Sequence, residues 1–112
     1  MKKIELKTQI TIFDSIDELP AEVKGLMNKA IAAKQNAYAP YSKFKVGAAM
    51  LLEDGTMITG NNQENAAYPS GMCAERVAIW KVSSEFPHKK ILKLAISASS
   101  SSQILKEPVA PC

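Results

Sequence analysis

The sequence is poor in the residues that most often bind metals or form disulfides, with one histidine and two cysteines among 112 residues. His88 has neither a cysteine nor an acidic pair near it in the chain, so we interpret it as a surface residue. Two cysteines in a chain without a secretory signal are typical of a reducing compartment, where a metal site or free thiols are more common than a disulfide. We therefore expect a cytoplasmic protein without a structural disulfide.

Long apolar segments and dense charged segments are also missing. No stretch approaches the ~20 apolar residues of a transmembrane helix, and Lys2 and Lys3 are followed by an alternating pattern instead of the apolar core of a signal peptide. The net charge of +3 comes from lysines spread along the chain, which gives no particular support to nucleic-acid binding. We expect neither a membrane nor a nucleic acid as a partner. A single domain is expected, because 46% hydrophobic content suffices for one core.

Residues 1–20 are expected to form an N-terminal strand-like arm and a helix cap. Apolar and polar residues alternate from Lys3 to Phe13, which is typical of a strand or an extended arm at the edge of a sheet. Ser15 and Glu18 have the spacing of a capping box, and Pro20 suits the first position of a helix. A helix is therefore expected to follow this segment.

Helical and strand patterns alternate in the rest of the chain. Apolar residues recur at three- and four-residue spacing in the helical segments, whereas the strands are short apolar runs bounded by turns. The expected helices span residues 21–37 and 72–86, the expected strands span 46–52, 57–62 and 91–98, and the expected loops include 41–44 and 99–103. This order predicts an α/β fold in which helices cover a mixed sheet.

Two potentially charged groups lie at the start of the second expected helix. Cys73 is placed where free N–H groups and the positive end of the helix dipole favour a thiolate. Glu75 shares a helical stripe with Ile79, Val82 and Phe86. A carboxylate on a core-facing stripe is costly to desolvate without a partner. A bound cation would satisfy both groups, although each taken alone has a plainer interpretation, as a first-turn acid or as a small buried cysteine.

The other cysteine changes the balance between these interpretations. Cys112 follows Pro111, 39 residues after Cys73. A Cys-Ala-Glu at one helix start followed by Pro-Cys at the next is the pattern of zinc deaminases, with a cysteine in place of the usual histidine. The pair of cysteines and Glu75 therefore indicate a zinc site.

Three motifs together resemble the small zinc-dependent cytidine deaminases. They are Tyr41–Ala49, with the sequence YSKFKVGAA, Gly60–Pro69, with GNNQENAAYP, and Cys73–Arg76, with CAER. The resemblance covers about residues 23–112. It implies a layered α/β/α fold with a central mixed sheet, in a domain of residues 21–112.

The resemblance also implies a cofactor and a catalytic residue. Zn²⁺ would be held by Cys73 and Cys112 and would activate a water molecule for attack on C4 of the cytosine ring. Glu75 would act as the general acid and base without binding the metal. Arg76 would not bind the metal, but its positive charge would offset the negative charge of the thiolates.

The same resemblance assigns a substrate-binding segment. Asn62 and Glu64 are similar to the pair that holds the ribose hydroxyls, Phe44 to the aromatic residue near the base, and Gln63 is included as part of the segment. From the composition alone, the default interpretation is a polar turn with side chain to backbone hydrogen bonds. A pair that recognises sugar hydroxyls would separate nucleosides from free bases.

The sequence departs from the family pattern at its end. The family motif is Pro-Cys-x-x-Cys, and the sequence stops at the first of these cysteines, so a third protein ligand to zinc is missing from it. Catalytic zinc sites usually have three protein ligands and a water molecule. We therefore expect a chain that is truncated inside the motif, with a domain that is incomplete at the C-terminus.

The expected function is hydrolytic deamination of cytidine and 2′-deoxycytidine to uridine and 2′-deoxyuridine in pyrimidine salvage, by a protein that the resemblance implies to be a homotetramer. Two alternatives remain open. One is a non-catalytic or metal-deficient module of the same fold. The other is a related deaminase that acts on another aminopyrimidine nucleoside or on nucleic acid, although the nucleic-acid enzymes usually have His-Ala-Glu where this chain has Cys73-Ala74-Glu75.

Overall fold

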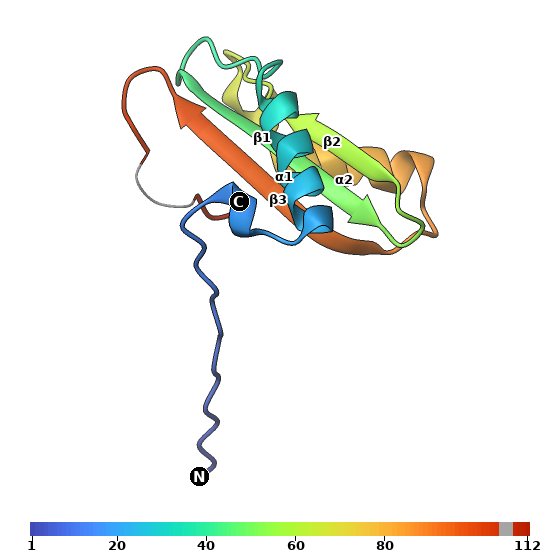
Figure 1. Cartoon of the computed structure of the whole chain (residues 1–112). Coiled ribbons are helices and arrows are strands. Elements are labelled where there is room, and N and C mark those ends of the chain that lie inside the picture. Colours follow the sequence, from blue (N-terminus) through green and yellow to red (C-terminus); the bar gives the residue numbers. More distant parts are fainter. Residues whose placement is uncertain (106–108) are drawn as a thin grey trace.

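The computed structural model describes residues 1–105 and 109–112 (Figure 1). Its elements are a 3₁₀ helix at Ile16–Glu18, α1 at Ala21–Lys34, β1 at Phe44–Leu52, β2 at Met57–Asn61, a 3₁₀ helix at Tyr68–Ser70, α2 at Ala74–Glu85 and β3 at Ile91–Ser100. The three strands form one sheet in the order β2-β1-β3. No helix in the described ranges is long and apolar enough to cross a membrane.

The central strand β1 explains the layered architecture. Successive side chains of a strand point to opposite faces, and this strand is buried from Gly47 to Leu52. Ala48, Met50 and Leu52 pack in one cluster with residues of α2, whereas Ala49 and Leu51 pack in another cluster with residues of α1. Figure 1 shows the two helices on opposite sides of the sheet. The α/β class expected from the sequence is confirmed.

The sheet differs from expectation in one respect. Strand β1 pairs antiparallel with both β2 and β3. The parallel pairing that would make a mixed sheet is therefore absent among the three strands of the described residues. Antiparallel neighbours need only short connections, and the turn between β1 and β2 is closed by Gly55 at a φ of 91°.

Two glycines allow the helices to lie close to the sheet. A Cβ atom on Gly47 would lie 2.0 Å from the backbone oxygen of Ala30 in α1. On the opposite face, a Cβ atom on Gly60 would lie 2.6 Å from the backbone nitrogen of Ala78 in α2. Backbone atoms of packed helices cannot move aside as a flexible side chain can, so these two positions fix the spacing of the three layers.

The substitution Gly47→Ala is expected to lower the free energy of unfolding by at least the ~1–3 kcal/mol that is typical of overpacking. The matched control is Gly25→Ala inside α1, where nothing lies within 4 Å of the added Cβ. This control should raise the free energy of unfolding by ~0.5–1 kcal/mol, because alanine favours a helix over glycine. Urea unfolding of both variants measures the difference, and equal effects would contradict the close packing of α1 on β1.

The N-terminal arm corrects one expectation. Residues 1–13 form no strand and pair with no strand of the sheet, and Figure 1 shows the arm running away from the rest of the chain. The alternating apolar side chains remain exposed, namely Ile4, Leu6, Ile10 and Ile12. The pattern fits an extended chain, but the expected place at a sheet edge is wrong. The division into residues 1–20 and 21–112 stays a prediction.

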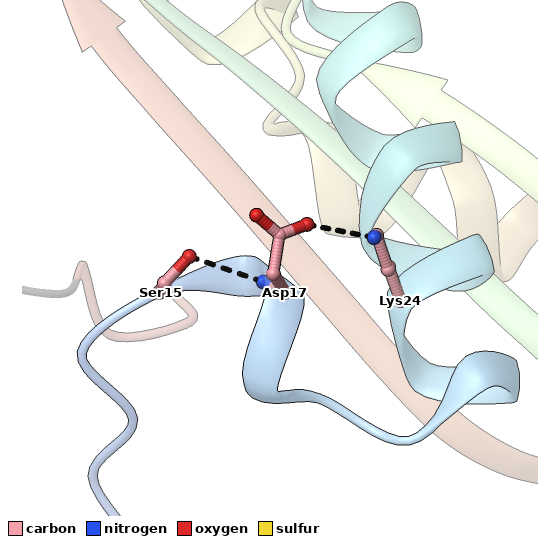
Figure 2. Close-up of polar contacts among 3 residues, drawn as sticks. All are labelled: Ser15, Asp17 and Lys24. Atoms are coloured by element: carbon pink, nitrogen blue, oxygen red, sulfur yellow. Dashed lines mark hydrogen bonds and ion pairs between the residues drawn. The ribbon is translucent and has the colours of Figure 1, made fainter.

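Ser15 caps a short 3₁₀ helix and not α1, the helix that the capping pattern was expected to begin. Ser15 Oγ accepts a hydrogen bond from the backbone nitrogen of Asp17 at 3.2 Å, and the Asp17 carboxylate pairs with Lys24 Nζ at 2.7 Å (Figure 2). Ser15 thus caps the 3₁₀ helix, and α1 begins after Pro20, which is its N-cap residue. Glu18 accepts from the backbone nitrogen of Asp14 instead of closing the expected box on Ser15.

Several boundaries also differ from the sequence prediction. Helix α1 ends at Lys34, three residues before the expected end at 37. Phe44, expected in a loop, is the first residue of β1, where it pairs with Ser100. The serine-rich segment expected as a loop therefore continues β3 through Ser100. Its composition favours a loop, but a partner strand supplies the hydrogen bonds that extend the ladder.

Candidate active site

The start of α2 places a cysteine where negative charge is favoured. Cys73 is the N-cap residue of α2, and its Sγ accepts a hydrogen bond from the backbone nitrogen of Arg76 at 3.4 Å. The N–H groups of the first turn and the positive end of the helix dipole stabilise a thiolate at such a position. The Arg76 contact with Cys73 is thus made by its backbone, while the Arg76 residue is exposed.

The end of the chain brings a second thiol to this helix start. Cys112 Sγ lies 2.7 Å from Cys73 Sγ, and the backbone nitrogen of Cys112 donates to Glu75 Oε2 at 2.7 Å. The potential ligand atoms of Cys73, Glu75 and Cys112 all lie within 4.8 Å of one another. Residues separated by 39 positions in the sequence therefore meet in one cluster.

The electrostatics of the cluster favour a cation. The hydrogen bond to Cys73 and, after it, the contact with Glu75 raise the pKa of the Cys112 thiol to about 12. Two thiolates and a carboxylate so close together repel one another, and only a positive charge between them allows all three to be ionised. Sulfur donors are preferred by zinc, so the donor set of Cys73 and Cys112 fits a zinc ion. Within the described ranges His88 does not join this group.

The position of Glu75 on α2 differs from the expected stripe. Two residues of the expected stripe, Val82 and Phe86, pack in the core, but Ile79 is 39% exposed. The other buried residues of α2 are Ala74 and Ala78. The small side chains form the buried face because α2 packs against the bare backbone at Gly60. Glu75 consequently lies beside the core-facing stripe and not on it. It is half-buried and lines a cavity.

This cavity has a volume of about 1000 Å³. It is bounded by the turn before β1, the loop that follows β2, the start of α2 and the C-terminal residues. The site residues expected from the sequence that line it are Phe44, Asn62, Gln63, Glu64, Cys73, Glu75, Arg76 and Cys112. A volume of this size is typical of a pocket for a small molecule.

Asn62 uses its side chain to hold the backbone at the start of β1. Its Oδ1 accepts from the backbone nitrogen of Val46 at 2.8 Å, and its Nδ2 donates to the backbone oxygen of Phe44 at 2.8 Å. An amide group has two donor hydrogens and two acceptor lone pairs. One donor and one acceptor of Asn62 therefore remain for a ligand.

Gln63 acts mainly through its backbone. Its nitrogen and oxygen form two hydrogen bonds with Met72, at 2.9 and 2.8 Å, which fasten the loop after β2 to the turn before α2. The side chain donates to Asn61 Oδ1 at 2.7 Å. Gln63 thereby fixes the distance between the segment that contains Asn62 and the segment that contains Cys73.

Glu64 is tied to the turn at residues 41–44, in which the sequence interpretation gave Ser42 no role. One carboxylate oxygen accepts from the backbone nitrogens of Tyr41 and Ser42, at 3.0 and 3.1 Å, and the other accepts from the Ser42 hydroxyl. The Ser42 hydrogen bond is the main cause that holds the pKa of Glu64 below its usual range. The sequence offers only a serine shortly before a strand as a signal, and the partner lies 22 residues away.

Residues 20–112 match the sequence profile of a family described as the cytidine and deoxycytidylate deaminase zinc-binding region. The chain belongs to this family. Membership in the deaminase family accords with the donor set of Cys73 and Cys112 at the start of α2 and with the carboxylate of Glu75 beside it.

Two named cytidine deaminases show the extent of the similarity. The protein from Halalkalibacterium halodurans is 45% identical over 87 residues, which cover 78% of this chain and 61% of that protein. The protein from Sporosarcina psychrophila is 43% identical over 91 residues, covering 81% and 62% respectively. The chain thus spans about three fifths of the length of these deaminases.

Solved structures of deaminases share the fold. The crystal structure of cytidine deaminase from Burkholderia pseudomallei matches with a TM-score of 0.69 and 38% identity, over 79% of this chain and 66% of that one. The structure of cytidine deaminase from Mycobacterium leprae matches with a TM-score of 0.68 and 32% identity, over 83% and 73%.

Proposed function

We propose that the protein hydrolyses cytidine and 2′-deoxycytidine to uridine and 2′-deoxyuridine, with release of ammonia. The observation that carries this proposal is the cluster of Cys73, Glu75 and Cys112, whose potential ligand atoms lie within 4.8 Å of one another in the wall of a cavity large enough for a nucleoside. The similarity to proteins named cytidine deaminases supports the substrate class.

Cys73 and Cys112 are the residues that would hold the zinc ion. When bound, zinc lowers the pKa of a water molecule towards neutrality and so supplies a nucleophile at physiological pH. Cys73 is the N-cap residue of α2, so its sulfur lies beside the free N–H groups of the first turn. The Arg76 side chain follows in the same first turn, from where its charge would offset that of the thiolates.

Glu75 would carry the protons. Its Oε2 is held by the backbone nitrogen of Cys112, which orients the carboxylate and leaves the other oxygen for substrate and water. In this position Glu75 can take a proton from the attacking water, deliver it to N3 of the pyrimidine and then assist the departure of ammonia. A half-buried carboxylate is shielded enough for this role and still open to the cavity.

The opposite wall of the cavity would bind the nucleoside. The free donor and acceptor of Asn62 and the carboxylate of Glu64 suit the hydroxyl groups of the sugar. Phe44, at the start of β1, would lie near the base. The backbone of Gln63 would keep this wall at a fixed distance from α2.

A panel of substrates tests the proposal. Cytidine and 2′-deoxycytidine should both be deaminated, while free cytosine should have a kcat/KM at least roughly 10²-fold lower, because it leaves Asn62 and Glu64 without their hydroxyl partners. Ammonia release measures all three rates, and a cytosine-containing oligonucleotide serves as a control that should not react. If cytosine reacted as fast as cytidine, the sugar-binding assignment would be wrong, and preference for the oligonucleotide would indicate a nucleic-acid deaminase.

The proposal extends to the setting in which the protein acts. On the family resemblance we infer a homotetramer that serves pyrimidine salvage in the cytoplasm. The presence of only two cysteines in the sequence supports a reducing compartment.

A further inference from the structure

One hydroxyl group in the turn before β1 makes hydrogen bonds with two residues of the candidate site. Ser42 Oγ accepts a hydrogen bond from the backbone nitrogen of Phe44 at 3.1 Å and donates its own hydrogen to a carboxylate oxygen of Glu64. The hydroxyl therefore joins the residue proposed to lie near the base to the residue proposed to read the sugar.

The backbone of this turn is held in an unusual conformation. Lys43 has a φ of 59°, the one positive φ of a non-glycine residue in the part of the chain that the structure describes. Side chains disfavour this left-handed region. The turn is fixed by hydrogen bonds from Lys43 N to Ala39 O and from Ser101 N to Lys43 O, both 3.1 Å long. Such strain persists only where the surroundings determine it, and it is common at functional sites.

The hydrogen bonds of Glu64 leave little freedom to its carboxylate. A carboxylate offers about four acceptor positions on its two oxygens. Three are taken, by the nitrogens of Tyr41 and Ser42 on one oxygen and by the Ser42 hydroxyl on the other. One acceptor position remains, on the oxygen that Ser42 Oγ contacts, and Glu64 lines the cavity.

We propose that Ser42 is a positioning residue for nucleoside recognition: its hydroxyl fixes the Glu64 carboxylate so that its remaining acceptor position receives one hydroxyl of the sugar. This inference rests on the proposed function, because it takes Glu64 as the group that reads the sugar. Without the Ser42 hydroxyl, the backbone nitrogens of Tyr41 and Ser42 still bind one carboxylate oxygen of Glu64. The other oxygen then lacks the hydrogen bond that fixes its orientation.

Kinetics of two Ser42 variants test this role. Ser42→Ala should raise KM for cytidine by about 10–100-fold, as for the loss of a hydrogen bond to a charged group, with kcat changed much less. Ser42→Thr keeps the hydroxyl and should restore KM to within about threefold of the original value. The thermal unfolding temperatures of both variants show whether the turn itself has been disrupted.

A double-mutant cycle separates positioning from a general structural effect. If Ser42 acts through Glu64, the substitution Ser42→Ala should change KM less than about twofold in a protein that already carries Glu64→Gln, because coupled residues are not additive. Additive effects of the two substitutions would overturn the proposal, since they would show that Ser42 acts independently of Glu64.

A measurement without substrate distinguishes this inference from the proposed function. The pKa of Glu64, followed by NMR of its carboxyl carbon, should rise towards the ordinary glutamate value in Ser42→Ala and stay low in Ser42→Thr. An unchanged pKa in Ser42→Ala would overturn the positioning role even if cytidine is a substrate. If the unaltered zinc-loaded protein did not deaminate cytidine, the proposed function would be wrong and so would the part of the inference that names a sugar.

Discussion

Glu75→Gln is expected to lower kcat for cytidine deamination by ~10²–10⁴-fold, the range typical of a lost general acid and base. Glutamine has nearly the same shape as glutamate and can still accept the hydrogen bond from the Cys112 backbone through its side-chain oxygen. It cannot take a proton from water or pass one to the pyrimidine. Zinc content and the free energy of unfolding should therefore remain nearly unchanged while turnover is lost.

Glu85→Gln provides the matched control for this experiment. Glu85 is the last residue of α2 and is exposed, at the opposite end of the helix from Glu75. The same chemical change there should leave kcat and KM as they are. Near-normal turnover in Glu75→Gln, measured beside this control, would remove Glu75 from the mechanism.

Cys73→Ser is expected to reduce the affinity for zinc by more than ~100-fold. Loss of a residue that only hydrogen-bonds to a metal ligand typically costs ~10–100-fold, and loss of the ligand itself should cost more. Serine is a preferred N-cap residue, so the start of α2 should be preserved and the free energy of unfolding of the metal-free protein should change by no more than ~1 kcal/mol. The variant thus removes the sulfur donor without removing the cap. Elemental analysis after dialysis against a chelator gives the zinc content.

The control for Cys73→Ser is Ser70→Ala in the 3₁₀ helix that precedes α2. This substitution alters a nearby side chain that is not part of the cluster. Zinc content should be unaffected by this change. If Cys73→Ser retained one chelator-resistant zinc ion per chain, Cys73 would not be a ligand and the metal site would have to be sought elsewhere.

The helices and strands could be predicted from the sequence where one pattern dominates. The apolar run of β1 indicated a strand buried on both faces, and the structure confirms that α1 and α2 cover those faces. The sequence patterns failed where secondary structure depends on pairing with another strand. The alternation in residues 3–13 permits a strand, but a strand needs a neighbour to bond with, and the arm has none in the described chain.

The serine-rich segment shows the reverse case. Ser99 and Ser100 have the composition of a loop, yet they extend β3 because Lys45 and Phe44 of β1 are available to pair with them. The stripe assigned to Glu75 was right for Val82 and Phe86, which pack in the core, and wrong for Ile79, which is exposed. The periodicity of α2 does not reveal that Gly60 has no side chain and so allows Ala74 and Ala78 to pack directly on the sheet.

The candidate site was predictable as a set of residues but not as a network. The motifs indicated Cys73, Glu75 and Cys112, and the structure places them together. Which atoms bind one another depends on chain segments that are distant in sequence. The Asn62 side chain forms hydrogen bonds with the backbone of β1, and the Ser42 hydroxyl donates to Glu64. No short sequence motif indicates these contacts, because each joins residues at least 16 positions apart.

The most direct test of a zinc-dependent deaminase site at the Cys73–Glu75–Cys112 cluster is the release of ammonia and uridine from cytidine at known zinc content. We expect equal amounts of both products, at a rate that is proportional to bound zinc, falls to background when a chelator removes the metal and returns when zinc is restored. Undiminished turnover by the metal-free protein, or no turnover at one zinc ion per chain, would contradict this function.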